Sequence, residues 1–179
     1  MARILDFRFA VAGSARRSVR PALLLSGLLA AAAPAQAAAQ ARTDDTVLMS
    51  TNAQARADQE RYGYADAVIA GDLIFLSGIV AGQAPGETSL TPAYERVFRI
   101  IGRILERAGA GYSDIVDVTT YHTDITAQIE AYAEVQRRIL GSPPPAWTAI
   151  DVDRLLPDGG ITEVKIVARR PAAAATRGN

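Results

Sequence analysis

Cysteine is absent from this chain of 179 residues, and histidine, lysine and tryptophan each occur only once. The lack of cysteine excludes a disulfide framework and a thiolate nucleophile. A single histidine cannot form a multi-histidine metal site, and no group of acidic residues has the spacing of a metal-binding motif. The sequence therefore predicts a site that holds no metal ion.

Positive charge is scarce outside the N-terminal segment. Five of the 19 basic residues and one of the 19 acidic residues fall within positions 1–37, so that 14 basic and 18 acidic residues remain in positions 38–179. The difference is a net charge near −4 for that part of the chain. Such a domain lacks the basic surface that nucleic acids require, and we expect no nucleic-acid partner.

Residues 1–37 predict a secretory signal peptide. Arginines precede an apolar stretch from Ala22 to Ala33, and Ala35-Gln36-Ala37 fits a small-x-small cleavage site, as does Ala39-Gln40-Ala41. The pair Arg16-Arg17 is compatible with the twin-arginine export route. Because the apolar stretch is shorter than the roughly 20 residues that span a bilayer, we expect a periplasmic or secreted protein that is not held in the membrane after cleavage. The alternatives are a disordered tail or a misplaced start codon.

The remaining sequence predicts one domain. Residues 38–58 are polar and unpatterned and predict a flexible lead-in, whereas residues 171–179 predict a disordered tail. The folded domain should occupy residues 59–170, a length that allows only a modest hydrophobic core.

Hydrophobic periodicity within residues 59–170 predicts two helices and five strands. Gly71-Asp72 is a two-residue turn signal and predicts a hairpin, and the glycine- and proline-containing segment 78–90 predicts a loop. The expected strands are 65–70, 73–77, 115–123, 147–152 and 161–169, and the expected helices are 91–108 and 126–140. The order β-β-α-β-α-β-β predicts an α+β domain with both helices on one face of a mixed sheet.

The last expected strand indicates what covers the other face of that sheet. Glu163, Lys165, Val167 and Arg169 alternate with the apolar residues of this strand. Their side chains are too charged for a core and too regular for a loop. A closed oligomer that buries this face, with ligand pockets between subunits, would satisfy the pattern.

Several stretches together resemble the Rid (reactive intermediate deaminase) family, also called YjgF. They occur in the family's order and cover nearly the whole expected domain: 64–68, 71–78, 114–119, 123–124, 144–146, 152–155 and 162–164. The resemblance implies a chorismate-mutase-like fold, a homotrimer with clefts between subunits, and no cofactor. For the best-known branch of the family it also implies the hydrolysis of enamines and imines, such as 2-aminoacrylate, to keto acids and ammonia.

The resemblance also assigns roles to individual residues. Tyr64 corresponds to a pocket tyrosine, Ser77 and Gly78 to a pocket serine and glycine, and Glu163 to a glutamate that positions water. The family's carboxylate-binding arginine corresponds to Trp147, and a frequent cysteine two positions later corresponds to Ala149. We therefore expect Glu163 and Tyr64 to be catalytic, and Ser77, Gly78, Trp147 and Ala149 to contact a small-molecule ligand. Some of these roles have an alternative. Trp147 could instead pack between subunits, Tyr64 could be a half-buried aromatic on an edge strand, and Glu163 could form an ion pair with an arginine of the next subunit.

The tryptophan limits which substrate can be expected. Arginine binds a carboxylate through two charge-assisted hydrogen bonds, whereas an indole offers one N–H donor and an apolar face. Two functions remain open. One is the hydrolytic deamination of a reactive enamine or imine, or a related hydrolysis, in a cleft between subunits. The other is a periplasmic trimer that binds a small ligand without chemistry.

Overall fold

The computed structural model describes residues 42–171. The predicted signal peptide, residues 38–41 of the expected lead-in and nearly all of the expected tail lie outside the described residues. No helix within residues 42–171 is both long and apolar enough to cross a membrane.

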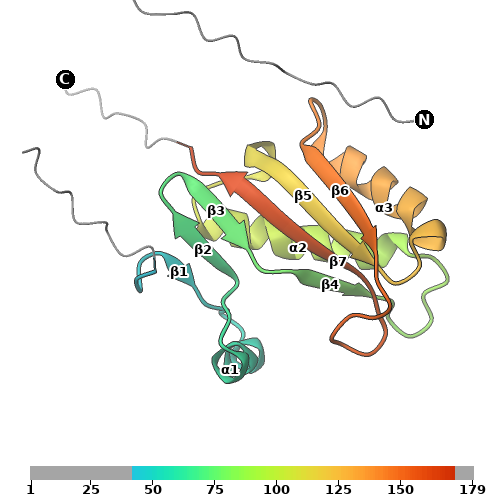
Figure 1. Ribbon diagram of the computed structural model, residues 1–179, viewed down its shortest axis with the longest axis horizontal. Coiled ribbons are helices and arrows are strands. Elements are labelled where there is room, and N and C mark those ends of the chain that lie inside the picture. The colour runs from blue at the N-terminus through green and yellow to red at the C-terminus, as the bar shows by residue number, and fades with distance from the viewer. Residues whose placement is uncertain (1–41, 172–179) are drawn as a thin grey trace, which may run out of the picture. The chain divides into compact units, whose positions relative to one another are not determined.

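A mixed seven-stranded sheet forms the centre of the domain (Figure 1). Its strands follow the order β1-β2-β3-β7-β5-β6, and β4 pairs with β7 beyond the end of β3. All pairings are antiparallel except that of β5 with β6. The strands are β1 (Val47–Leu48), β2 (Ala67–Ala70), β3 (Leu73–Leu76), β4 (Ile79–Gly82), β5 (Ile115–His122), β6 (Ala146–Asp151) and β7 (Gly160–Arg169).

Two long helices pack on one face of this sheet. They are α2 (Thr91–Arg107) and α3 (Ile125–Leu140), and both lie behind the sheet in Figure 1. Pro92 occupies the first turn of α2, as its fixed φ favours, and Leu90 is the N-cap residue. The Asp124 side chain caps α3 by accepting a hydrogen bond from the Ala127 N–H. The predicted hairpin, both predicted helices and the α+β class are thereby confirmed.

The hydrophobic core lies between these helices and the sheet. The apolar stripe of α2 supplies fully buried residues such as Phe98, Ile101 and Leu105. Val164, Ile166 and Ala168 of β7 and Val118 of β5 face the helices from the sheet. Tyr132 of α3 packs in the same core. Because strand side chains alternate, Glu163, Lys165 and Val167 project from the opposite face, which α2 and α3 leave open.

Two expectations were wrong. The expected lead-in contains strand β1, which pairs with β2, and most of helix α1 (Ala53–Tyr62). Asn52 caps this helix at one end, and Gly63, at φ 73°, terminates it at the other. The expected loop 78–90 begins with strand β4, which pairs with the first half of β7. Each element was missed because it is short or polar, so hydrophobic periodicity does not reveal it.

Candidate functional site

A groove on the open face brings together four of the predicted site residues. Tyr64, Ser77, Gly78 and Glu163 line it, and its volume is about 550 Å³. The remaining lining comes from α1, from β4 and from the loop between β6 and β7: Asp58, Tyr62, Val80, Leu156 and Pro157.

An irregularity in the sheet forms the floor of this groove. Phe75 of β3 pairs with Val167, and Ile79 of β4 pairs with Val164, so four steps along one chain oppose three steps along β7. The extra residue interrupts the ladder at Ser77 and Gly78. Such bulges re-aim local side chains and are common beside functional sites.

Glu163 packs directly against the backbone of Gly78. A Cβ atom built on Gly78 would lie 1.7 Å from Glu163 Oε1 and 2.5 Å from its Cδ. Only glycine leaves room for the carboxyl group at this position. Within residues 42–171 the carboxylate accepts no hydrogen bond and forms no ion pair, not even with Lys165 two residues further on. Its oxygens are therefore free for a ligand or a water molecule.

Helix α1 is fixed beside the groove by one buried side chain. Gln59 is 2% exposed. Its Oε1 accepts from the Ser50 N–H at 2.8 Å, and its Nε2 donates to Asp66 Oδ1 at 2.7 Å. This bridge holds Asp58 and Tyr62 at the groove. Sequence reasoning missed both residues, although Asn52 and Gly63 are helix-capping signals that could have revealed α1.

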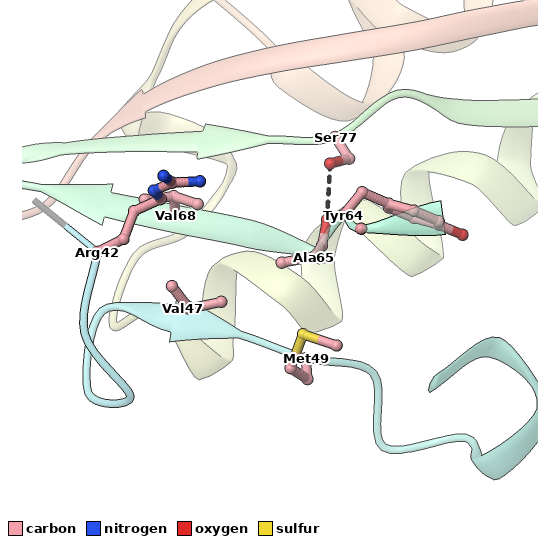
Figure 2. A pocket seen from close by; sticks show the side chains of 8 residues that line it. Arg42, Val47, Met49, Tyr64, Ala65, Val68 and Ser77 are labelled. Atoms are coloured by element: carbon pink, nitrogen blue, oxygen red, sulfur yellow. Dashed lines mark hydrogen bonds between the residues drawn. The ribbon is translucent and has the colours of Figure 1, made fainter. Parts of the chain in front are cut away.

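A second groove, of about 500 Å³, adjoins the first and shares Tyr64 and Ser77 with it. Figure 2 shows Arg42 and Tyr64 at opposite ends of this second groove. The dashed line marks the Ser77 hydroxyl donating to the Ala65 carbonyl at 2.6 Å. Because that proton is engaged, the Ser77 oxygen is available to a ligand chiefly as an acceptor.

The other two predicted site residues lie on the opposite face of the sheet. Trp147 pairs with Val118 and Ala149 with Thr120, both of which face the helices. The Trp147 ring packs on Tyr132 with centroids 5.5 Å apart, and its Nε1 donates to Thr120 Oγ1 at 3.0 Å. One chain therefore does not bring Trp147 or Ala149 to the Glu163 groove. The alternation of side chains along β6 indicates which face of the sheet Trp147 and Ala149 occupy, whereas the family resemblance alone does not.

His122 is buried in the same polar cluster as the Trp147 N–H. Its Nε2 lies 2.9 Å from Thr120 Oγ1, and its Nδ1 lies 3.2 Å from Thr162 Oγ1, which can donate onward to Gln128 Oε1 at 3.3 Å. If the proton is placed on Nδ1, every donor in this series of hydrogen bonds around His122 has an acceptor. Burial lowers the pKa of His122 below its usual value. His122 is therefore a structural residue whose two ring nitrogens are both engaged.

Metal binding finds no support in residues 42–171. No three histidine, aspartate or glutamate side chains in that range are grouped so that they could hold a metal ion. The chemistry available at the groove is that of a carboxylate, two tyrosine hydroxyls and a serine oxygen.

These features define an α+β domain with an open-face groove floored by a glycine and a glutamate. Residues 54–170 match the family model described as Endoribonuclease L-PSP. The match spans more than half of the chain, and the chain belongs to this family, whose members are also named YjgF, RutC and Rid. The resemblance noted from the sequence is confirmed.

Relatives of known name or structure agree with this assignment. The chain is 37% identical over 111 residues to the RutC family protein YjgH of Escherichia coli, an alignment that covers 60% of this chain and 83% of that protein. It is 30% identical over 110 residues to the chloroplastic Reactive Intermediate Deaminase A of Arabidopsis thaliana, covering 59% and 57% of the two chains. A solved structure of YJGH aligns with a TM-score of 0.61 at 31% identity, covering 75% of this chain and all of the other. A Mycobacterium tuberculosis member of the YjgF/YER057c/UK114 family gives 0.60 at 25% identity, covering 69% and 98%.

Proposed function

We propose that this protein hydrolyses a small reactive enamine or imine, or a related C=N compound, at the Glu163 groove. The observation that carries the proposal is the contact of the Glu163 carboxyl group with Gly78. The bulge and the missing side chain of Gly78 hold a free carboxylate at the wall of a groove that also presents two tyrosines. The name of the Arabidopsis relative supports the same chemistry.

The reaction needs no cofactor. The imine reacts in its protonated form: Glu163 accepts a proton from a water molecule as the water oxygen bonds to the imine carbon, which yields a neutral carbinolamine. Glu163 then returns this proton to the nitrogen, the C–N bond breaks with release of ammonia, and the ammonia takes up the hydroxyl proton as the carbon becomes a carbonyl, so that protonated imine and water give a carbonyl compound and ammonium. An enamine first takes a proton on carbon to become the imine, and Tyr64, exposed in the groove, is the donor that we assign to this step.

Trp147 changes the substrate that we propose. Its only donor is already bonded to Thr120, so the indole cannot bind a carboxylate in the way an arginine would. We therefore favour a substrate without a carboxylate at that point. Trp147 and Ala149 would reach the Glu163 groove only from another copy of the chain, and we propose a homotrimer with the cleft between subunits. Export by the N-terminal segment forms part of the same proposal.

Ammonia release by the purified protein tests this function. The imines are generated in the assay by an amino-acid oxidase, which leaves a carboxylate on the product, or by an amine oxidase, which does not. We expect acceleration over spontaneous hydrolysis, greater for the amine-derived imine, and a loss of about 100-fold in E163Q, the usual size of a general-base contribution.

The matched control is E134Q. Glu134 is an exposed glutamate on α3 that has no ion pair in the described part of the chain, so this variant should keep full activity. The Trp147→Arg variant shows whether carboxylate recognition can be restored. A wild type that never exceeds the spontaneous rate would refute the enzymatic proposal. The second candidate, a trimer that binds a small ligand without chemistry, would then be favoured, because Trp147 replaces the family's carboxylate-binding arginine and its N–H is already bonded to Thr120.

A further inference from the structure

A separate pocket lies where α3 turns back into β6, a connection visible in Figure 1. It is on the helix side of the sheet, and none of its lining residues belongs to the Glu163 groove. Its volume is about 180 Å³, below the 300–1,000 Å³ typical of sites for drug-sized ligands. Trp147, Leu140, Pro144 and Pro145 form apolar walls. The pocket therefore suits a ligand of about one ring.

The indole wall of this pocket is fixed before any ligand binds. The hydrogen bond from Trp147 Nε1 to Thr120 and the contact with the Tyr132 ring determine the position of the side chain. Tyr132 is itself fully buried. A preorganised aromatic wall binds a flat apolar group without the entropic cost of ordering a side chain.

One buried polar side chain in the pocket has free donors. Gln136 is only 7% exposed and lines the pocket. Its Oε1 accepts a hydrogen bond from the Tyr132 hydroxyl at 2.9 Å, so the two N–H donors of the amide remain. Nothing in the described part of the chain accepts a hydrogen bond from them. No fully buried side-chain nitrogen or oxygen within residues 42–171 lacks a partner, so the Gln136 amide nitrogen is accessible from the pocket and can donate to a ligand or to water.

The pocket also carries a positive charge that has no partner within residues 42–171. Arg137 lines it and forms no ion pair there, whereas the adjacent Arg138 is bound to Glu95 at 2.6 Å. No aspartate or glutamate lines the pocket. A guanidinium beside amide N–H donors is complementary to a carboxylate.

We propose that this pocket binds a small, flat, apolar carboxylate. The hydrocarbon part lies between Trp147, Leu140 and the prolines, and the carboxylate accepts hydrogen bonds from Gln136 and Arg137. In the proposed trimer Trp147 would border both this pocket and the Glu163 cleft of the neighbouring subunit. Binding in the pocket nevertheless requires no catalysis by Glu163, so it can be tested whether or not the protein proves to be a deaminase.

The sequence provides its own probe, because Trp147 is the only tryptophan in the chain. Its fluorescence is recorded while the purified full-length protein is titrated with benzoate, with neutral benzamide or with cationic benzylamine. We expect a saturable change with benzoate, weaker binding of benzamide and the weakest binding of benzylamine. R137Q should weaken benzoate binding about tenfold, in line with the loss of a charge-assisted hydrogen bond, and should leave benzamide binding nearly unchanged.

The matched control is R138Q, which removes the same charge one residue away but outside the pocket. It should bind benzoate within about twofold of the wild type, since Arg138 does not line the pocket and its charge is already paired with Glu95. Circular dichroism verifies that both variants keep the fold. The proposal is overturned if benzoate gives no saturable change, if R137Q and R138Q bind it equally, or if benzylamine binds as tightly as benzoate.

Discussion

Replacing Gly78 with alanine tests the geometry on which the proposed chemistry depends. The backbone of Gly78 does not lie in the left-handed region, so alanine is acceptable to the chain itself. The obstacle is Glu163, whose Oε1 would lie 1.7 Å from the new Cβ, while ordinary contacts begin at 3.4 Å. The carboxyl oxygen must therefore move by about 1.7 Å, the difference between these two distances.

A displacement of that size should be costly for catalysis and cheap for stability. Misplacing a catalytic group by about 1 Å can cost about 100-fold in rate, so we expect kcat/KM for imine hydrolysis to fall at least about 100-fold. Glu163 Cγ would also lie 2.7 Å from the new Cβ, so the whole side chain must turn. This half-buried side chain can turn away into the groove at a cost of about 1 kcal/mol, so Tm should fall by only a few degrees. G82A, where the nearest atom to a new Cβ is 3.4 Å away, is the control and should keep its activity.

The double variant G78A/E163Q separates this explanation from a general disturbance of the site. If Gly78 acts only by giving room to the carboxylate, the double variant should be no slower than E163Q alone. A folded G78A protein with wild-type activity would refute the reasoning, and so would losses that simply multiply in the double variant.

Two further predictions concern stability. Burial lowers the pKa of His122 from its ordinary 6.5, so the unfolded chain binds the proton more readily than the folded chain. The contribution of His122 to the free energy of unfolding is therefore constant near neutral pH and falls by at most about 1.4 kcal/mol per pH unit as the pH drops below 6.5. It levels off below the pKa of the folded state. Urea titrations between neutral and mildly acidic pH should show this slope in the wild type and a smaller one in H122Q, and equal slopes would contradict the assignment. Q59A should free α1 from Ser50 and Asp66, so limited proteolysis should cut within residues 50–63 much faster than in the wild type while far-ultraviolet circular dichroism changes little; Q54A, at an exposed position of the same helix, should resist like the wild type.

Much of the fold could be predicted from the sequence because its main elements have strong local signals. The three- and four-residue spacing of apolar positions from Tyr94 to Leu105 predicts α2, and Gly71-Asp72 between two apolar runs predicts the hairpin. The alternation in β7 also predicted an uncovered sheet face on the side of Glu163. Helix α1 and strand β4 escaped notice because neither is long enough or apolar enough to create a period.

For the candidate site, too, some features follow from the sequence and others only from the tertiary structure. The sequence determined which residue types are available: no cysteine, one histidine, and one tryptophan where the family has an arginine. It also contains Glu163 and the Ser77-Gly78 pair, but these lie far apart along the chain and meet only after folding. The tertiary structure decided which of these residues contact one another. The extra residue between β3 and β4 presses Gly78 against Glu163, and the parity of β6 turns Trp147 toward Tyr132, Gln136 and Arg137 on the other face. Strand parity and a one-residue bulge depend on pairing between segments far apart in the chain, and that pairing is a property of the assembled sheet rather than of any local stretch of residues.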